Sequence, residues 1–163
     1  MNIVLHEPGI ALNTGNIGRT CAAAGAELHL IRPYGFRLNE KEIKRAGMDY
    51  WERLKVTEYV DYEDFLIRNP GAKIWYATTK ARRIYTEASF DDSDFIMFGN
   101  ESRGIPEEIL VNNKDTCIRI PMAEGERSLN LANSAAIVLY EALRQQDFKG
   151  LELCGNLHRL SWE

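Results

Sequence analysis

Residues 118–144, with the sequence IRIPMAEGERSLNLANSAAIVLYEALR, form the stretch on which the predicted fold depends. Its apolar first residues indicate a strand that stops at Pro121, and a polar loop containing Gly125 follows. We predict a long helix beginning at Ser128, because a serine hydroxyl can accept hydrogen bonds from the free N–H groups of a first helical turn. The start of this helix is interpreted as a ligand site.

Two apolar stripes run along the predicted helix when its residues are placed about 100° apart. Covering one sheet needs only one stripe, so we interpret the second as a subunit contact. In that contact Val138 would pack between small residues that allow two helices to approach closely. The first stripe holds Leu129, Ala132, Ala136, Leu139, Tyr140 and Leu143, the second holds Leu131, Ala135, Val138 and Ala142, and the amide-rich remainder holds Asn130, Asn133, Ser134 and Glu141.

Segments typical of strands and of helices alternate along the rest of the chain. This alternation predicts an α/β fold, with a mainly parallel sheet flanked by helices. Strands are predicted at Asn2–His6, Glu27–Ile31, Leu54–Thr57, Lys73–Thr78, Asp94–Phe98 and Thr116–Ile120, and further helices at Asn13–Gly25, Leu38–Arg45, Tyr62–Ile67 and Pro106–Leu110.

Three polar turns follow predicted strand ends, at Thr78–Thr79, Gly99–Gly104 and Pro121–Ser128. Ligands of open α/β sheets bind beyond the carboxyl ends of the strands, so we expect these turns to meet at a ligand site. The second turn has the glycine spacing of a phosphate-binding loop, but Ile105-Pro106 follows where such a loop has lysine and a hydroxyl residue. The chain also lacks the G-x-G-x-x-G and G-x-S-x-G signatures of dinucleotide-binding and hydrolase folds.

Composition is that of an ordinary soluble globular domain. The 163 residues are 45% hydrophobic and 27% charged, with no apolar run long enough for a membrane span and no signal peptide. The three cysteines lack metal-like spacing. Cys21 and Cys117 lie in apolar segments and are predicted to be buried free thiols, which fits a reducing cytoplasm. The net charge of −4 disfavours a broad nucleic-acid-binding surface, so any RNA contact must be local or shared between subunits.

Two charged segments have both a structural and a functional interpretation. Lys41, Lys44 and Arg45 share one side of a predicted helix, which is either a solvated face or an RNA patch. Tyr50 and Trp51 follow closely and favour RNA, because exposed rings can stack on splayed bases. In the second of the three turns, Glu101 and Arg103 could be no more than a surface ion pair.

Three motifs resemble those of the SPOUT RNA methyltransferases, and most closely the short YibK/TrmL type, the tRNA wobble-nucleotide 2′-O-methyltransferases. Shorter matches occur at Glu7-Pro8, in the run from Arg45 to Tyr50 and at Thr78-Thr79-Lys80. The resemblance covers residues 1–150, which we take as one domain, and leaves 151–163 as a tail. The motifs are NTGNIGR at residues 13–19, FGNESRGIP at 98–106, and IRIPM with RSLNLANS between 118 and 134.

The resemblance implies a C-terminal trefoil knot that holds S-adenosyl-L-methionine, with S-adenosyl-L-homocysteine as the product. It also implies a homodimer through the C-terminal helix and no metal. The expected reaction is 2′-O-methylation of cytidine or uridine at the wobble position of tRNA, with leucine tRNAs as the expected substrates. Carried over by motif position, the cofactor-binding residues are Ala77, Thr78, Gly99, Glu101, Gly104, Ile120, Met122, Ser128 and Leu129. The RNA-binding assignments Lys41, Lys44 and Arg45 rest instead on their being the clearest local cluster of cations.

The same resemblance assigns catalytic roles to Arg19 and Asn130. A guanidinium has a pKa above about 12 and is a poor base, so Arg19 is expected to stabilise charge or orient a phosphate. Asn130 is expected to orient the hydroxyl or the cofactor. The alternatives are a non-catalytic knotted RNA-binding or assembly factor and a 2′-O-methyltransferase acting at another RNA position. A Rossmann-type oxidoreductase is disfavoured by the missing glycine signature.

Overall fold

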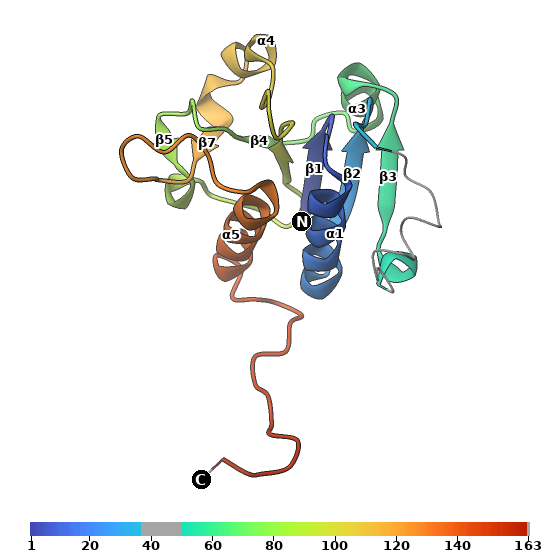
Figure 1. Cartoon of the computed structure of the whole chain (residues 1–163), viewed down its shortest axis with the longest axis vertical. Coiled ribbons are helices and arrows are strands. Elements are labelled where there is room, and N and C mark those ends of the chain that lie inside the picture. The colour runs from blue at the N-terminus through green and yellow to red at the C-terminus, as the bar shows by residue number, and fades with distance from the viewer. Residues whose placement is uncertain (37–49, 163) are drawn as a thin grey trace.

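A seven-stranded parallel sheet runs through the middle of the molecule (Figure 1). The computed structural model describes residues 1–36 and 50–162. The strand order is β3-β2-β1-β6-β4-β7-β5, and every strand pair in it is parallel. The strands are β1 (Asn2–His6), β2 (Glu27–Ile31), β3 (Val56–Tyr59), β4 (Ile74–Ala77), β5 (Arg83–Ile84), β6 (Phe95–Phe98) and β7 (Cys117–Arg119).

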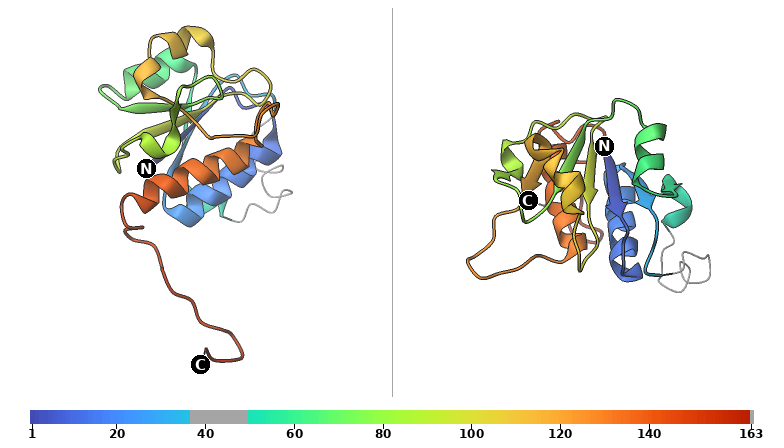
Figure 2. Two further views of the ribbon diagram at one scale, coloured as in Figure 1. Left: turned by 90° about the vertical axis from the view of Figure 1, so that its left-hand side faces the viewer. Right: turned by 90° about the horizontal axis from the view of Figure 1, so that it is seen from above.

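Helices cover both faces of the sheet, as the alternating pattern predicted. On one face, α1 (Ala11–Ala24) and α5 (Leu131–Arg144) lie side by side, and on the other lie α3 (Tyr62–Arg68) and α4 (Glu107–Val111) (Figures 1 and 2). The α/β class with a mainly parallel sheet is therefore confirmed. Short 3₁₀ turns complete the chain at η1 (Trp51–Arg53), η2 (Tyr85–Glu87) and η3 (Lys114–Thr116).

The sheet separates two hydrophobic clusters because successive side chains of a strand point to opposite faces. Within β1, Ile3 and Leu5 join the cluster under α1 and α5, whereas Val4 joins the cluster that contains Phe65 of α3 and Leu110 of α4. Both faces of β1 are therefore buried, as expected for a central parallel strand.

Two of the buried side chains are cysteine thiols. Cys21 lies in α1 and Cys117 in β7, and the prediction of buried free thiols is confirmed for both. Burial raises the pKa of the Cys21 thiol to about 12, so this cysteine is held as the neutral thiol.

Helix α1 ends where the sequence predicted, at a glycine. Gly25 has φ of 66° and its N–H donates to the carbonyl of Cys21, which is the left-handed cap that glycine adopts without a steric penalty. The turn brings the chain directly back into β2, which pairs in parallel with β1.

Helix α5 begins two residues later than predicted, because Asn130 and not Ser128 is its N-cap. The Asn130 Oδ1 accepts hydrogen bonds from the Ala132 N–H at 2.9 Å and from the Asn133 N–H at 3.3 Å. Ser128 is exposed in the preceding loop. Serine and asparagine are about equally good N-caps, so tertiary contacts, described below, determine that Asn130 rather than Ser128 caps α5.

The interpretation of the second apolar stripe as a subunit contact is wrong. Ala135, Val138 and Ala142 are 1%, 0% and 0% exposed, because α5 packs against α1 and the sheet within one chain. The exposed apolar residues of α5 are instead Ile137 and Tyr140, at 37% and 44% exposure. Any contact between chains through this helix must use that other side.

The interpretation of Tyr50 as an exposed stacking ring is also wrong. Tyr50 is buried and its hydroxyl donates to the carbonyl of Gly15 in α1. Trp51 is half-buried and packs at Gly18, where an added Cβ would lie 3.0 Å from the Trp51 ring. Both rings therefore anchor η1 to α1. The predicted helix over residues 38–45, with the RNA-binding assignments Lys41, Lys44 and Arg45, lies outside the described residues.

Two smaller differences concern the strands and the C-terminal end. Strand β3 begins two residues later than predicted, and β5 was not predicted because two residues carry no recognisable alternation. Beyond α5, residues 151–162 run away from the sheet (Figure 1). Among residues 1–36 and 50–162, no helix is long and apolar enough to cross a membrane.

Candidate functional site

A cavity of about 660 Å³ opens at the carboxyl ends of β4, β6 and β7. The three polar turns predicted to meet do meet here, because Thr78–Thr79 after β4, Gly99–Gly104 after β6 and Pro121–Ser128 after β7 all contribute lining residues. The Thr78 N–H donates to the Ile118 carbonyl at 2.9 Å, which holds the first turn against β7. Both the size and the position are those of a small-molecule site in an open α/β sheet.

Every residue assigned to the cofactor from the motifs lines this one cavity. Asn130, assigned as catalytic, lines it too. The chain therefore brings together ten of the assigned positions although they lie up to 53 residues apart in sequence, between residues 77 and 130. The cofactor assignments are Ala77, Thr78, Gly99, Glu101, Gly104, Ile120, Met122, Ser128 and Leu129.

Arg19 is not among the residues that line the cavity. It is exposed on α1, six residues beyond Asn13, and therefore about 9 Å further along the helix axis from the cavity. Its neighbours on the same exposed side of α1 are Leu12, Asn16 and Ala23. The structure of one chain thus separates Arg19 from the residues with which it was expected to act.

The turn after β6 folds back tightly on itself, and we call Gly99–Gly104 the braced rim. A Cβ added to Gly99 would lie 2.1 Å from the Gly104 carbonyl carbon and 2.2 Å from the Ile105 nitrogen. The Gly104 N–H donates to the Asn100 carbonyl at 2.8 Å. Only glycine fits at position 99, since any side chain would push into main-chain atoms that cannot move aside.

Both the oxygen and the nitrogen of the Asn100 side-chain amide hold the braced rim in place. Its Oδ1 accepts from the N–H groups of Ser102 at 2.9 Å and Arg103 at 3.2 Å, while its Nδ2 donates to the Glu7 carbonyl at 2.8 Å. The loop is thereby held against the end of β1. Asn100 was not assigned a role from the sequence, although it stands within the second motif.

Glu101 joins the braced rim to the start of α1. Its carboxylate accepts from the Gly9 N–H at 2.8 Å, the Ile10 N–H at 3.2 Å and the Asn13 Nδ2 at 3.0 Å. A carboxylate at a helix N-terminus also interacts favourably with the helix dipole. The interpretation of Glu101 and Arg103 as an ion pair with each other is wrong, because Arg103 pairs with Glu7 at 2.8 Å.

Asn13 completes a chain of hydrogen bonds across the site. Its Oδ1 accepts from the Asn130 Nδ2 at 3.1 Å, while its own Nδ2 donates to Glu101. Asn13 is 7% exposed, so both groups are withdrawn from water. The braced rim, α1 and the N-cap of α5 are therefore connected by side chains, which explains why Asn130 rather than Ser128 caps α5.

Asn13 received no role from the sequence, although it opens the first of the three motifs. A buried amide at a helix start must find hydrogen-bond partners, and that requirement was the available signal.

The opposite side of the cavity is much less constrained, and we call Pro121–Ser128 the open rim. Within it, among the described residues, the structure has one backbone hydrogen bond, from the Glu126 N–H to the Ala123 carbonyl at 3.3 Å. Its residues are exposed except for Met122, which is half-buried. The two rims of one cavity thus differ sharply in how they are held.

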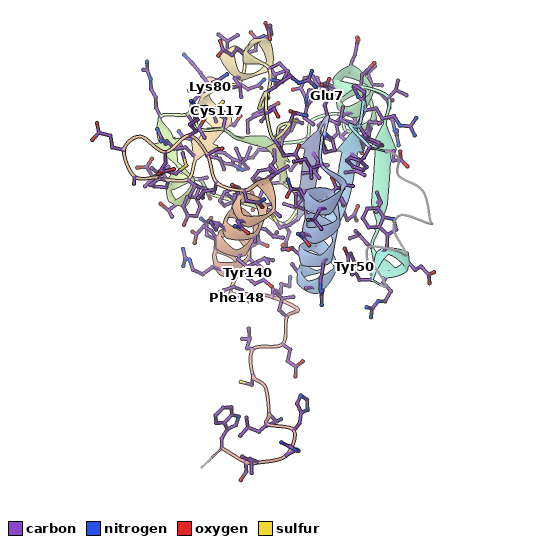
Figure 3. All side chains as sticks on the ribbon, in the orientation of Figure 1. Glu7, Tyr50, Lys80, Cys117, Tyr140 and Phe148 are labelled. Carbon is purple, nitrogen blue, oxygen red and sulfur yellow. The ribbon has the colours of Figure 1, made fainter. Side chains whose placement is uncertain are left out.

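The cavity is electropositive although the chain as a whole is acidic. Its basic lining residues are Lys80, Arg103, Arg119 and Arg127, and its one acidic lining residue is Glu101. Figure 3 shows Glu7 and Lys80 at the same end of the molecule, opposite Tyr140 and Phe148. The described lining of the cavity therefore has more basic than acidic side chains.

Comparison with known proteins gives one family. Residues 1–140 match the model of the SpoU rRNA Methylase family. A relative from Geobacillus stearothermophilus is 48% identical over 154 residues, covering 93% of this chain and 98% of its own. A relative from Escherichia coli strain K12, named tRNA (cytidine(34)-2′-O)-methyltransferase, is 44% identical over 154 residues, covering 94% and 98%.

Solved structures agree in fold. One, described as giving insights into the 2-OH methylation of C/U34 on tRNA, matches with a TM-score of 0.84 at 41% identity and covers 90% of this chain and 95% of that one. Another, an AdoMet-bound rRNA methyltransferase from Sinorhizobium meliloti, matches with a TM-score of 0.76 at 28% identity and covers 88% and 55%.

Proposed function

The chain belongs to the SpoU rRNA Methylase family, and on this premise we propose that it is a tRNA 2′-O-methyltransferase acting at the wobble nucleotide. The methyl group of S-adenosyl-L-methionine is transferred to the ribose 2′-hydroxyl of cytidine or uridine 34. The observation that carries the proposal is the convergence of all the motif-assigned cofactor residues on one cavity. Its support from relatives is the named tRNA methyltransferase at 44% identity over nearly the whole chain.

S-adenosyl-L-methionine fits the cavity by the chemistry of its lining. Apolar side chains of Ile120 and Leu129 alternate with main-chain N–H and C=O groups of the braced rim, which suits a ligand with an adenine ring and polar ends. The bound cofactor supplies an activated methyl group on a sulfonium. Release of S-adenosyl-L-homocysteine from the same cavity completes the proposed turnover.

The chain's own part in the reaction is to orient the ribose and to accommodate the hydroxyl proton. Asn130 uses its Oδ1 and one Nδ2 hydrogen internally, so one N–H of this amide remains to face the cavity. Arg19, as a permanently charged guanidinium, would stabilise negative charge or hold a phosphate rather than accept the proton.

We propose a homodimer through the exposed side of α5, where Ile137 and Tyr140 lie. Because Arg19 does not line the cavity of its own chain, the second copy is proposed to join one chain's Arg19 to the other chain's cavity. Mixing an inactive Arg19→Ala protein with an inactive Gly99→Val protein should then restore part of the methyl transfer. No recovery in a mixture shown to form mixed dimers would contradict this arrangement.

The remaining features are proposed on the resemblance and the family match. Residues 1–150 would form the methyltransferase domain with the C-terminal trefoil knot, and residues 151–163 would lie outside it. The family match over residues 1–140 supports the domain assignment. The proposed site of action is the cytoplasm, where tRNA is modified in bacteria.

Incubation with methyl-labelled S-adenosyl-L-methionine and tRNA from a strain lacking wobble methylation tests the function. Label should appear on the ribose of nucleotide 34 when digested tRNA is mapped by mass spectrometry, first in leucine tRNAs. Label at another position would identify a methyltransferase of different specificity. Binding of tRNA without any label would identify a non-catalytic RNA-binding factor.

A further inference from the structure

Two arginines of the cavity have no partner within the described residues. Lys80 pairs with Glu107 at 2.7 Å and Arg103 pairs with Glu7 at 2.8 Å, so neither charge is free. The side chains of Arg119, at the end of β7, and of Arg127, in the open rim, make no ion pair or hydrogen bond with residues 1–36 and 50–162. Two uncompensated guanidinium groups therefore line one cavity.

The carboxylate in the cavity does not compensate them. Both oxygens of Glu101 are already used by N–H donors from Gly9, Ile10 and Asn13. Uncompensated like charges lining one cavity repel each other, and the chain's overall charge of −4 shows that basic residues are not simply abundant. The pair is therefore expected to serve an anionic ligand.

The cofactor does not account for two such groups. S-adenosyl-L-methionine carries an ammonium and a sulfonium against one carboxylate, so its net charge is positive near neutral pH. A site built for it alone would not gather unpaired cations. The RNA substrate is a polyanion, and guanidinium is the side chain best suited to bind a phosphate with two parallel hydrogen bonds.

The structure of ribose determines which phosphate lies nearest to the reacting 2′-hydroxyl. The 2′-hydroxyl and the 3′-phosphate sit on adjacent carbons of the ring. Any enzyme that presents the 2′-hydroxyl to a cofactor in this cavity must therefore place the 3′-phosphate of the same nucleotide at the cavity mouth. Arg127 is exposed and Arg119 is half-buried, so a phosphate can reach both from solvent.

We propose that Arg119 and Arg127 bind the 3′-phosphate of the target nucleotide and so position its 2′-hydroxyl for transfer. This inference rests on the proposed function and specifies its substrate contact. It adds an RNA contact beside the open rim, whose Met122 and Ser128 keep their cofactor assignments.

Binding measurements on Arg119→Gln, Arg127→Gln and the double variant test the proposal. The S-adenosyl-L-homocysteine Kd should stay within about twofold of the wild-type value. The Kd for an anticodon stem-loop should rise at least about tenfold in the double variant, and the salt dependence of binding should lose a slope of about 0.7 for the lost phosphate contact. Arg82→Gln is the matched control, because Arg82 is exposed close to Lys80 but does not line the cavity.

A chemically modified substrate sharpens the test. In a stem-loop whose target nucleotide carries a neutral methylphosphonate on its 3′ side, wild-type binding should fall to the level of the double variant. The double variant itself should bind the modified and unmodified RNAs equally. Arg119→Lys with Arg127→Lys, which keeps the charge, should retain part of the RNA affinity if the double glutamine variant folds poorly.

Three results would overturn the proposal. One is unchanged stem-loop affinity in a folded double variant, and another is a methylphosphonate effect of equal size in both proteins. The third is a loss of S-adenosyl-L-homocysteine affinity beyond about tenfold, which would assign the arginines to the cofactor carboxylate. All are equilibrium measurements, so they decide the phosphate site even if wild-type protein fails to methylate nucleotide 34, the result that would refute the proposed function.

Discussion

The two rims of the cavity differ in how their main chain is held. In the braced rim, Asn100 and Glu101 between them make hydrogen bonds to the end of β1, to the start of α1 and to the loop's own N–H groups. The open rim is longer, exposed and nearly without internal hydrogen bonds among the described residues. One side of the cavity has a preset shape, and the other can be entered from solvent.

This difference indicates how two unlike ligands can share one site. A small cofactor is bound best by a preorganised surface, because little conformational freedom is then lost on binding. A polymer must arrive from solvent, dock through charge and leave again, which an exposed rim with unpaired cations permits. We therefore expect substitutions in the braced rim to act on the cofactor and on stability, and substitutions of Arg119 and Arg127 to act on RNA.

The largest effect is expected for Gly99→Val. Its side chain would collide with the main chain of Gly104 and Ile105, at a cost of about 3 kcal/mol, so S-adenosyl-L-homocysteine affinity should fall about a hundredfold by calorimetry. Gly155→Val is the control, since no atom lies within 4 Å of an added Cβ there. Full affinity in a folded Gly99→Val protein would remove the braced rim from the site.

A smaller effect is expected for Glu101→Gln. The glutamine amide would place an NH₂ group against N–H groups that now donate to the carboxylate. The free energy of unfolding should therefore fall by about 2 kcal/mol. Glu107→Gln removes a carboxylate from an exposed pair with Lys80, and should change stability far less than Glu101→Gln. Equal effects in urea unfolding would show that Glu101 is not a brace.

Asn130 and Ser128, near the start of α5, offer a further comparison, because Asn130 is connected to the braced rim through Asn13 and Ser128 belongs to the open rim. Asn130→Ala removes the N-cap and the hydrogen bond to Asn13, so unfolding should become easier by about 1 kcal/mol. Ser128→Ala, in the open rim, should be neutral within about 0.5 kcal/mol. If Ser128→Ala lowered the free energy of unfolding more than Asn130→Ala does, Ser128 would be the N-cap of α5, as predicted from the sequence.

The smallest effect concerns pH at the end of β1, where the braced rim is anchored. Burial lowers the pKa of His6, so folding favours its neutral form and stability is lost as the pH falls below about 6.5. Burial lowers the pKa of His29 to about 4, which adds a slope of the same sign. The stability of wild type relative to His6→Gln, measured by urea unfolding at several pH values, isolates His6 and should decrease as the pH falls below about 6.5.

Local signals in the sequence were enough for the described strands other than β5, with β3 displaced by two residues, and for the Gly25 cap and the three turns. These features depend on side chains within a few residues of each other, such as the apolar run of β6 and the glycines after it. The residues that the resemblance assigned to the cofactor all line one cavity, because position within a motif determines position along a strand end.

Features that depend on which elements become neighbours could not be predicted. The cap at Asn130 depends on Asn13, which is 117 residues away in sequence. The second stripe of α5 is buried because the crossovers place α1 beside it, and Tyr50 is buried for the same reason, under Gly15 of that helix. Arg19 stands in the right motif yet faces solvent, since helix phase and not motif membership sets its direction.

A crystal structure with S-adenosyl-L-homocysteine and an anticodon stem-loop would test the division between the rims most directly. The account expects the cofactor product against Gly99–Gly104 and the 3′-phosphate of nucleotide 34 between the guanidinium groups of Arg119 and Arg127. A structure in which either arginine binds the carboxylate of S-adenosyl-L-homocysteine, with the RNA phosphate elsewhere, would contradict it.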